Sequence, residues 1–497
     1  MLFRSHNQKK MTAEELKHFR DHFDIDVSDQ DVENYRLYKP ADDAPEMQYL
    51  KARRQTLGGY LPARHVNKTP LTIPSYKDFA KRLLAGTAEG REMSTTTAFV
   101  QMLSAISKDK EIGSKIVPIT PDESRTFGME GLFRQLGIYN TEGQRYEPED
   151  RQQVMWYKES KDGQILQEGI NEGGAFSSWL AAGTSYSHHQ LPMIPFYIFY
   201  SMFGFQRIAD YAWMAGDMRA KGFLLGATAG RTTINGEGLQ HEDGHSHVIA
   251  NLVPNCISYD PTYAYELAVI LWHGMKQMYA DGDDVYFYIT VMNENYGHPE
   301  MPKNCEQGII NGMYLLHASD KPNHIAKAKD KQKLHVQLLG SGTILKEVEA
   351  AAVLLEKDFG VTSDIWSITS SNNLYRDGQD VARWNRLNPT KKPKQTYIAE
   401  CLDKTVGPII AATDYVKLYT DQLRQFMPRR YETLGTDGFG RSDTRSKLRA
   451  HFEVDRFNVV VAALKALADD GVIPASKVSD AIKKYQLSTT KINPLFA

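Results

Sequence analysis

Cysteine is scarce in this sequence, and apolar runs of membrane-spanning length are missing. The 497 residues include three cysteines, Cys256, Cys305 and Cys401, which lie far apart and form no CxxC pair. This argues against a disulfide framework and is typical of a protein in the reducing cytoplasm. The longest apolar runs, such as residues 191–200, are too short to cross a bilayer, and the N-terminus has no apolar stretch of signal-peptide length.

A charge excess of either sign is also missing. Lys and Arg total 59 and Asp and Glu total 61, so the formal net charge is −2. The sequence therefore predicts no nucleic-acid partner and no membrane partner, because no overall field would attract a polyanion. With 41% hydrophobic and 24% charged residues, the composition is that of an ordinary globular protein. The length is enough for two or three domains.

From about residue 90, segments with strand character alternate with segments of helical periodicity. This order predicts an α/β fold with mostly parallel sheets flanked by helices. Ser94 is expected to cap one helix, and Asp260 another with Pro261 at its first position. The predicted strands of the first unit lie at residues 115–120, 192–200, 222–228 and 285–291.

A second alternating unit follows a lysine-rich stretch. It comprises a strand at 335–339, a tight turn at 340–342, a helix at 345–359 ended by Gly360, and a strand at 364–369. The turn reads Gly-Ser-Gly but has Leu345 where a dinucleotide-binding loop has its third glycine, which favours a turn that opens a packed helix.

Composition divides the chain into four parts. Residues 1–70 resemble a loop-rich N-terminal arm, and we expect the chain to begin inside a longer protein. Residues 71–316 form the first predicted domain, and residues 334–497 the second. The stretch between them, 317–333, contains five lysines and few apolar residues, which indicates a solvated linker.

The segment from His241 to His245 fits the HExxH pattern of zinc proteases. That chemistry needs two imidazoles one helical turn apart on one face. Here Asp243-Gly244 lies inside the motif, and two glycines lie just upstream. Glycine in a helix interior costs roughly 1 kcal/mol, and helical periodicity is missing nearby. A polar loop around a small-molecule site is the better interpretation, and we predict no metal ligand in this chain.

Three segments in a fixed order resemble the pyrimidine-binding domain of transketolase-like, thiamine-diphosphate-dependent enzymes. They are Gln-Glu-Gly-Ile-Asn-Glu at 167–172, Pro-Phe-Tyr-Ile-Phe-Tyr-Ser-Met-Phe-Gly at 195–204, and Gly-Glu-Gly-Leu-Gln-His-Glu-Asp-Gly-His-Ser-His at 236–247. Motifs at 122–133 and 436–443 narrow the resemblance to the homodimeric bacterial pyruvate dehydrogenases. The resemblance implies a pyrimidine-binding domain followed by a transketolase C-terminal-like domain.

The resemblance also implies a role for each motif position. Glu172 would hydrogen-bond the aminopyrimidine ring of the cofactor and promote its imino tautomer, although the same glutamate, taken alone, is an ordinary charge at a helix N-terminus. Phe203 would stack on the pyrimidine, with Tyr200 beside it. His241 and Glu237 would lie near the substrate. The remaining implied residues are Glu123 at the cofactor and His6 in acetyl transfer.

The family is expected to bind thiamine diphosphate with Mg²⁺ through a Gly-Asp-Gly motif that these 497 residues do not contain. The metal ligands are therefore expected in a diphosphate-binding domain outside this sequence. The implied reaction converts pyruvate to carbon dioxide and an acetyl group on the lipoyl domain of a dihydrolipoyl acetyltransferase. We expect a homodimer, or a heteromer with a diphosphate-binding chain. A catalytically silent scaffold subunit and a related transketolase-like enzyme are the alternatives.

Overall fold

The computed structural model describes residues 10–60, 66–67, 69–149, 157–319 and 334–497. The chain divides into two compact units, residues 1–64 and 65–497, and each is described by itself. In the described part of the chain, no helix combines the length and apolarity that crossing a membrane requires.

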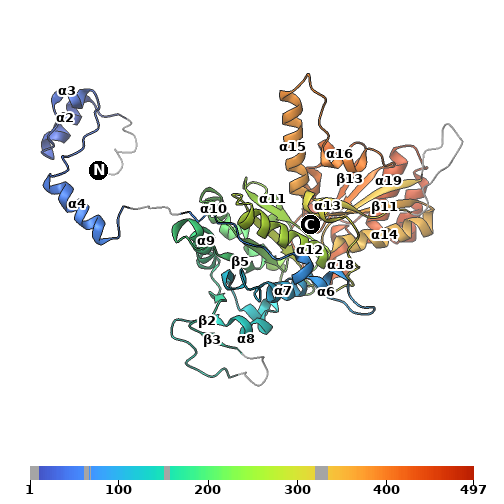
Figure 1. The fold of residues 1–497 in the computed structure, drawn as a ribbon. Helices are drawn as coiled ribbons and strands as arrows, with labels where there is room; N and C mark the ends of the chain where they lie inside the picture. Colours follow the sequence, from blue (N-terminus) through green and yellow to red (C-terminus); the bar gives the residue numbers. More distant parts are fainter. Residues whose placement is uncertain (1–9, 61–65, 68, 150–156, 320–333) are drawn as a thin grey trace. The chain divides into compact units, whose positions relative to one another are not determined.

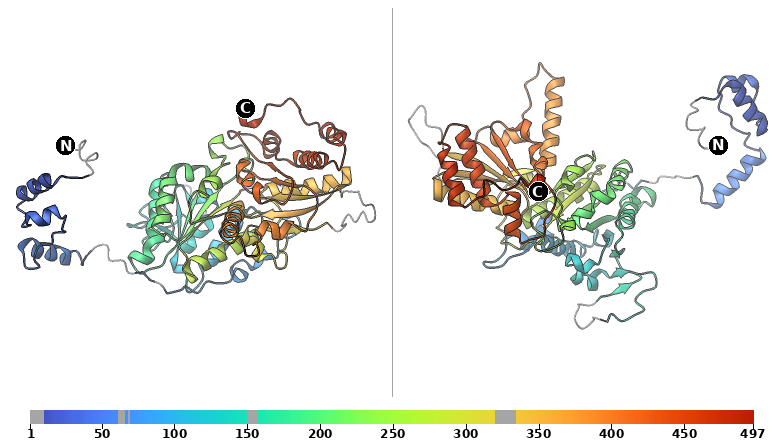
Figure 2. Two further views of the ribbon diagram at one scale, coloured as in Figure 1. Left: turned by 90° about the horizontal axis from the view of Figure 1, so that it is seen from above. Right: turned by 180° about the vertical axis from the view of Figure 1, so that it is seen from behind.

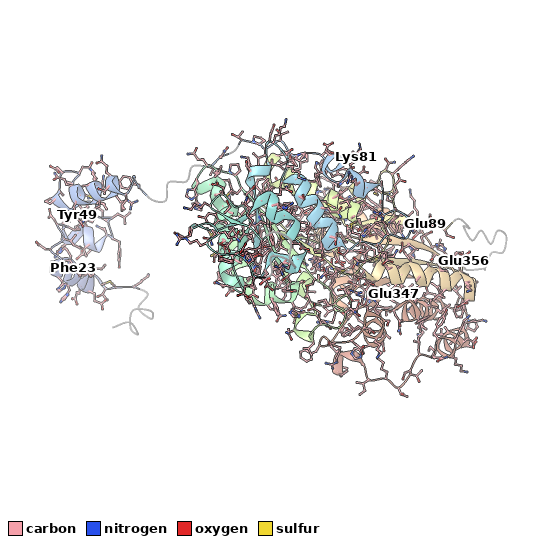
Figure 3. The ribbon with its side chains drawn as sticks, turned by 90° about the horizontal axis from the view of Figure 1, so that it is seen from below. Phe23, Tyr49, Lys81, Glu89, Glu347 and Glu356 are labelled. Carbon is pink, nitrogen blue, oxygen red and sulfur yellow. The ribbon has the colours of Figure 1, made fainter. Side chains whose placement is uncertain are left out.

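The first unit contains three short helices in its described residues, and Figure 3 marks Phe23 and Tyr49 on it. Thr12 caps the first of them in a capping box with Glu15. None of the three helices buries a side chain. The described residues of this unit thus form helices where the sequence indicated a loop-rich arm. The helices are α2 (Ala13–His22), α3 (Asp29–Glu33) and α4 (Pro45–Thr56).

The second unit is built on two sheets (Figure 1). The first sheet has six strands in the order β4-β1-β5-β6-β8-β7, and every adjacent pair is parallel. Its central strands are buried on both faces, as parallel sheets between helices require. The strands are β1 (Ile116–Thr120), β4 (Leu166–Gln167), β5 (Ile194–Phe199), β6 (Phe223–Ala227), β7 (Cys256–Tyr259) and β8 (Tyr286–Val291).

Alternation along β5 sends side chains into two separate cores. Phe196 and Ile198 join the core with α7 and α12, whereas Tyr197 and Phe199 join the core with α9 and α10. Ser94 caps α7 as predicted. The first domain also holds a small parallel pair, β2 (Ile138–Tyr139) and β3 (Glu159–Ser160). Its helices are α5 (Tyr76–Phe79), α6 (Lys81–Leu84), α7 (Thr95–Ile106), α8 (Phe133–Leu136), α9 (Glu172–His188), α10 (Phe205–Asp217), α11 (Ser246–Ala250), α12 (Ala264–Met275) and α13 (Glu306–Asn311).

The second sheet has the order β13-β12-β10-β11-β9, and only its edge strand β9 runs antiparallel to its neighbour. Helix α14 lies along one face, and Figure 3 marks Glu347 near its start and Glu356 near its end. The strands are β9 (Met313–His317), β10 (His335–Gly340), β11 (Thr362–Ile368), β12 (Ile409–Ala412) and β13 (Tyr431–Leu434). The helices are α14 (Ile344–Phe359), α15 (Ser371–Leu387), α16 (Tyr397–Leu402), α17 (Leu418–Asp421), α18 (Arg445–Phe452), α19 (Arg456–Asp469) and α20 (Ser476–Lys484).

Two predictions at element boundaries differ from the structure. Asp260 does not cap α12, which begins at Ala264 after Tyr263, because its carboxylate is buried and accepts a hydrogen bond from the Thr290 hydroxyl instead. Strand β9 belongs to the second sheet, although the sequence placed residues up to 316 with the first domain. The rest of the predicted linker, 320–333, lies outside the described residues.

The two sheets are joined by a buried loop that follows β6. Its Thr232 donates its backbone N–H, at 3.1 Å, and its hydroxyl, at 2.7 Å, to the carboxylate of Asp414, which follows β12. Burial raises the pKa of Asp414 to about 6. On the same loop, Arg231 donates to the backbone carbonyls of Thr436 and Gly438. These contacts connect the loop that carries the 236–247 motif to the second domain.

Candidate functional site

The predicted site residues follow four neighbouring strands of the first sheet. Glu123 comes after β1, Glu172 after β4, Tyr200 and Phe203 after β5, and His241 after β6. The carboxyl ends of parallel strands meet at one edge of a sheet, which is where open α/β sheets bind ligands. The topology therefore places residues up to 118 positions apart in the sequence at the same edge of the sheet.

Glu172 is the first residue of α9. Asn171 caps this helix by accepting a hydrogen bond from the Gly174 backbone N–H at 2.9 Å. The Glu172 side chain is only 11% exposed, and Arg207 binds its Oε1 at 2.5 Å. The Tyr197 hydroxyl donates to the Glu172 backbone carbonyl at 3.4 Å, which ties the start of the helix to β5. The carboxylate is thus held in one place at the start of the helix.

Arg207 connects Glu172 to the predicted stacking ring. Its guanidinium carbon lies 4.2 Å from the centroid of Phe203, in cation–π geometry. Phe203 ends a short 3₁₀ turn and Arg207 lies in the first turn of α10, so the two are four residues apart on one side. Arg207 therefore fixes the position of the Phe203 ring relative to the Glu172 carboxylate.

Tyr200, Phe203 and His241 form a three-ring cluster. The His241 ring centroid lies 5.0 Å from Tyr200 and 5.2 Å from Phe203, and the two aromatic rings are 6.1 Å apart. Glu237 Oε2 lies 3.2 Å from His241 Nδ1. Burial, with the charges of Asp122 and Glu237, raises the pKa of Tyr200 and keeps its phenol neutral. The cluster is an apolar wall with one imidazole and one carboxylate at its margin.

The loop that carries His241 is held in place by the buried carboxylate of Asp243. This buried carboxylate accepts hydrogen bonds from the hydroxyls of Ser201 and Ser246 and from the backbone N–H of His245 and Ser246, the latter two at 3.0 Å. Burial opposes its charge, but the charge of His245 and the hydroxyl donors hold the pKa of Asp243 below its ordinary value. Ser201 begins the turn that ends at Phe203, so Asp243 ties the histidine loop to the aromatic cluster.

Glu242, next to His241, points into the second domain. Its Oε2 accepts the backbone N–H of Arg441 at 2.6 Å, and its side chain is buried. Burial raises the pKa of Glu242 to about 8. His241 ends a single 3₁₀ turn, and Glu242 and Asp243 are not helical. The prediction of a polar loop here is confirmed, and the helical spacing of the zinc motif is not formed.

Glu123 is less closely tied to this cluster than the other predicted site residues. Glu123 is exposed, and its backbone N–H donates to the neighbouring Asp122 carboxylate at 2.7 Å. The loops after β1 and β4 are joined by Gln167, whose side-chain oxygen accepts the Ser124 backbone N–H at 2.9 Å. His6 lies outside the described residues.

The donor set suits the pyrimidine part of thiamine diphosphate better than its metal diphosphate. An aminopyrimidine needs an aromatic face and a carboxylate opposite a ring nitrogen, and Phe203 and Glu172 offer both. Within the described residues, no group of three or more His, Cys, Asp or Glu side chains could hold a metal ion. The described residues therefore fit one half of such a cofactor.

Arg207, Ser201 and Asp243 were not singled out from the sequence. A cation four residues after Phe203, at the start of a helix, is a usable signal for Arg207. Asp243 and Ser201 are 42 residues apart, and their contact depends on the pairing of β5 with β6.

Family models match most of the second unit. A model described as the pyruvate dehydrogenase E1 component middle domain matches residues 71–299. A model described as the transketolase-like TK C-terminal domain matches residues 312–455.

Curated relatives extend this similarity over 99% of the chain. The pyruvate dehydrogenase E1 component of Pseudomonas aeruginosa is 59% identical over 492 residues, and that of Escherichia coli K12 is 53% identical over 496. These alignments cover 99% of this chain and 54% of each relative, so the chain spans about half the length of the curated relatives it matches.

Solved structures show the same fold at low identity. Transketolase from Campylobacter jejuni matches with a TM-score of 0.57 and 15% identity, covering 91% of this chain and 59% of that one. Transketolase from Leishmania mexicana matches with a TM-score of 0.57 and 15% identity, covering 93% and 59%. The mostly parallel sheets flanked by helices are therefore transketolase-like, as predicted.

Proposed function

Since this chain belongs to the pyruvate dehydrogenase E1 family, we propose that it supplies the pyrimidine-binding half of a thiamine-diphosphate site. The complete site would decarboxylate pyruvate oxidatively. It would pass the acetyl group to the lipoyl domain of a dihydrolipoyl acetyltransferase, which feeds acetyl-CoA synthesis. Three free cysteines fit a reducing compartment such as the cytoplasm.

One observation carries this proposal. A nearly buried carboxylate, Glu172, is fixed at the carboxyl edge of the sheet by Arg207, which also lies over the face of Phe203. A carboxylate held in one place can accept a hydrogen bond from a ring N–H and favour the ring tautomer that carries that hydrogen. Bound thiamine diphosphate would supply the electron sink for decarboxylation.

Each remaining residue has a role in this proposal. Phe203 and Tyr200 cover the pyrimidine ring with an aromatic surface and exclude water from it. His241 lies between those two rings and orients the pyruvate carboxylate or carbonyl with Glu237 at its side. Glu123 reaches the cofactor from the β1 loop, and His6 takes part in acetyl transfer.

The diphosphate and Mg²⁺ need ligands that the described residues do not group together. We propose that a diphosphate-binding chain or domain supplies them, in a dimer or a heteromer. The lack of grouped ligands among the described residues also leaves a second candidate, a subunit that assembles with the complex without catalysing.

Reconstitution separates the two candidates. The chain would be mixed with the diphosphate-binding part of the Pseudomonas aeruginosa relative, thiamine diphosphate, Mg²⁺ and carboxyl-labelled pyruvate. Release of labelled carbon dioxide by the mixture, but not by either part alone or with Glu172→Gln, supports the enzyme. A mixture that forms a stable complex and releases no label contradicts it and leaves the silent subunit.

A further inference from the structure

The C-terminal end of α15 and the loop after it project from the second domain (Figure 1; Figure 2, right). Residues 383–394, here called the basic tip, form this projection. They contain five cationic side chains and no acidic one, a formal charge of +5. All five side chains are exposed, and none forms an ion pair with a described residue. They are Arg383, Arg386, Lys391, Lys392 and Lys394.

The helix dipole does not account for this charge. Cations near a helix C-terminus are favourable, which explains Arg383 and Arg386 on the last turns of α15. The three lysines lie beyond Leu387, where the helix ends, and the dipole effect falls off within one turn. Between residues 381 and 399 the sequence has no acidic side chain that could neutralise them.

The basic tip is held in shape by its own contacts. Asn385 donates from its side chain to the Lys394 carbonyl at 3.0 Å and accepts the Lys394 backbone N–H at 2.8 Å. The Asn388 side chain donates to the Trp384 carbonyl at 2.9 Å. The Lys394 ammonium lies 4.7 Å from the Trp384 ring centroid and that of Lys391 lies 5.8 Å away. A preorganised surface loses less entropy on binding.

The basic tip also presents apolar surface. Leu387 is 58% exposed at the point where the helix ends, and Trp384 is partly buried under the lysines. Protein interfaces commonly place aromatic side chains and Arg at the centre of a polar rim, and the basic tip offers Trp384 and Leu387 among its cations.

We propose that the basic tip docks an acidic segment of a partner protein, with an apolar side chain of that segment against Leu387. A protein segment fits better than a nucleic acid. The whole chain has a formal charge of −2, so the chain outside the basic tip carries −2 minus +5, or −7. A long polyanion would be repelled by the negative charge outside the basic tip, whereas a short acidic peptide would contact the basic tip without reaching that charge.

Fluorescence anisotropy tests this with a labelled 12-residue peptide of Glu, Asp and Leu. The full chain should bind it with an affinity that falls as salt rises, and Lys391→Glu with Lys392→Glu should weaken binding at least tenfold. The control, Lys108→Glu with Lys110→Glu, makes the same charge change at two exposed lysines elsewhere and should stay within twofold. Leu387→Ser should weaken binding about threefold without changing the salt dependence.

Three results would overturn the proposal. One is equal weakening by the two lysine pairs, and another is a Leu387→Ser variant that binds like the wild type. The third is tighter binding of a 20-nucleotide single strand or of phosphatidylserine vesicles than of the peptide. Circular dichroism melting of each variant shows that the fold is retained.

Discussion

At the scale of single residues, the candidate site depends on side chains that are held in position by hydrogen bonds and ion pairs with their neighbours. Arg207 binds Glu172 Oε1 at 2.5 Å and lies over Phe203, so one cation positions two groups of the proposed cofactor site. Asp243 holds the loop that carries His241 in place by accepting hydrogen bonds from the hydroxyls of Ser201 and Ser246. These supporting residues matter because a loop alone would not hold His241 between two rings.

Glu242 predicts a pH-dependent stability. Its folded pKa is about 8 because of burial, above the unfolded value near 4.5, so the folded state binds more protons between these values. Stability from this group is therefore present below pH 4.5 and is lost as pH rises toward 8. Glu242→Gln removes the titration and keeps an acceptor for the Arg441 N–H. The variant should become increasingly more stable than wild type from pH 5 to 8, by at most about 1.4 kcal/mol per pH unit.

Urea unfolding at pH 5, 6, 7 and 8 measures this difference. If the free energy of unfolding of Glu242→Gln exceeds that of the wild type by an amount that grows with pH, the result supports a buried, protonated Glu242. Two parallel stability curves would contradict it.

The site residues illustrate what the sequence could and could not indicate. The resemblance implied that Tyr200, Phe203 and His241 share one site, and the structure brings their rings within about 6 Å. The sequence pattern could not place Asp243 beneath them, because that contact depends on which strand follows β5 in the sheet. It also could not show that Asp260 turns inward rather than capping α12.

At the scale of elements, the position of Glu172 depends on how α9 begins. Asn171→Ala removes the side chain that accepts the Gly174 N–H, and should lower the free energy of unfolding by about 1 kcal/mol. Asn171→Ser keeps a capping oxygen and should therefore retain most of the wild-type free energy of unfolding. Urea denaturation compares the two variants. If Asn171→Ala unfolds at the wild-type midpoint, the cap does not stabilise this helix.

Regular elements were the most predictable part of the fold. Helix α14 ends where Gly360 adopts a left-handed conformation, with φ of 67°, as the glycine indicated. The four strands predicted in the first unit each overlap a strand of the first sheet. Strand β9 was missed because its pairing partner, β11, comes about 50 residues later and no local pattern reveals an antiparallel edge.

At the scale of the whole molecule, the loop after β6 joins the site to the second domain. Asp414→Ala would leave the Thr232 N–H and hydroxyl without their acceptor at the junction of the sheets. The loss should lower the free energy of unfolding by about 1–3 kcal/mol. Asp414→Asn keeps an acceptor and should lose less. Calorimetric melting measures both, and an Asp414→Ala variant as stable as wild type would show that this contact does not hold the domains together.

The central claim is that this chain contributes Glu172 to a thiamine-diphosphate site that a diphosphate-binding partner completes. The most direct measurement is calorimetric titration of thiamine diphosphate with Mg²⁺ into the chain mixed with a supplied diphosphate-binding domain. The account predicts saturable binding that Glu172→Gln weakens about tenfold, or about 1.4 kcal/mol. It also predicts much weaker binding to the chain alone. Equal affinities for wild type and Glu172→Gln would contradict the assignment of the pyrimidine site to Glu172.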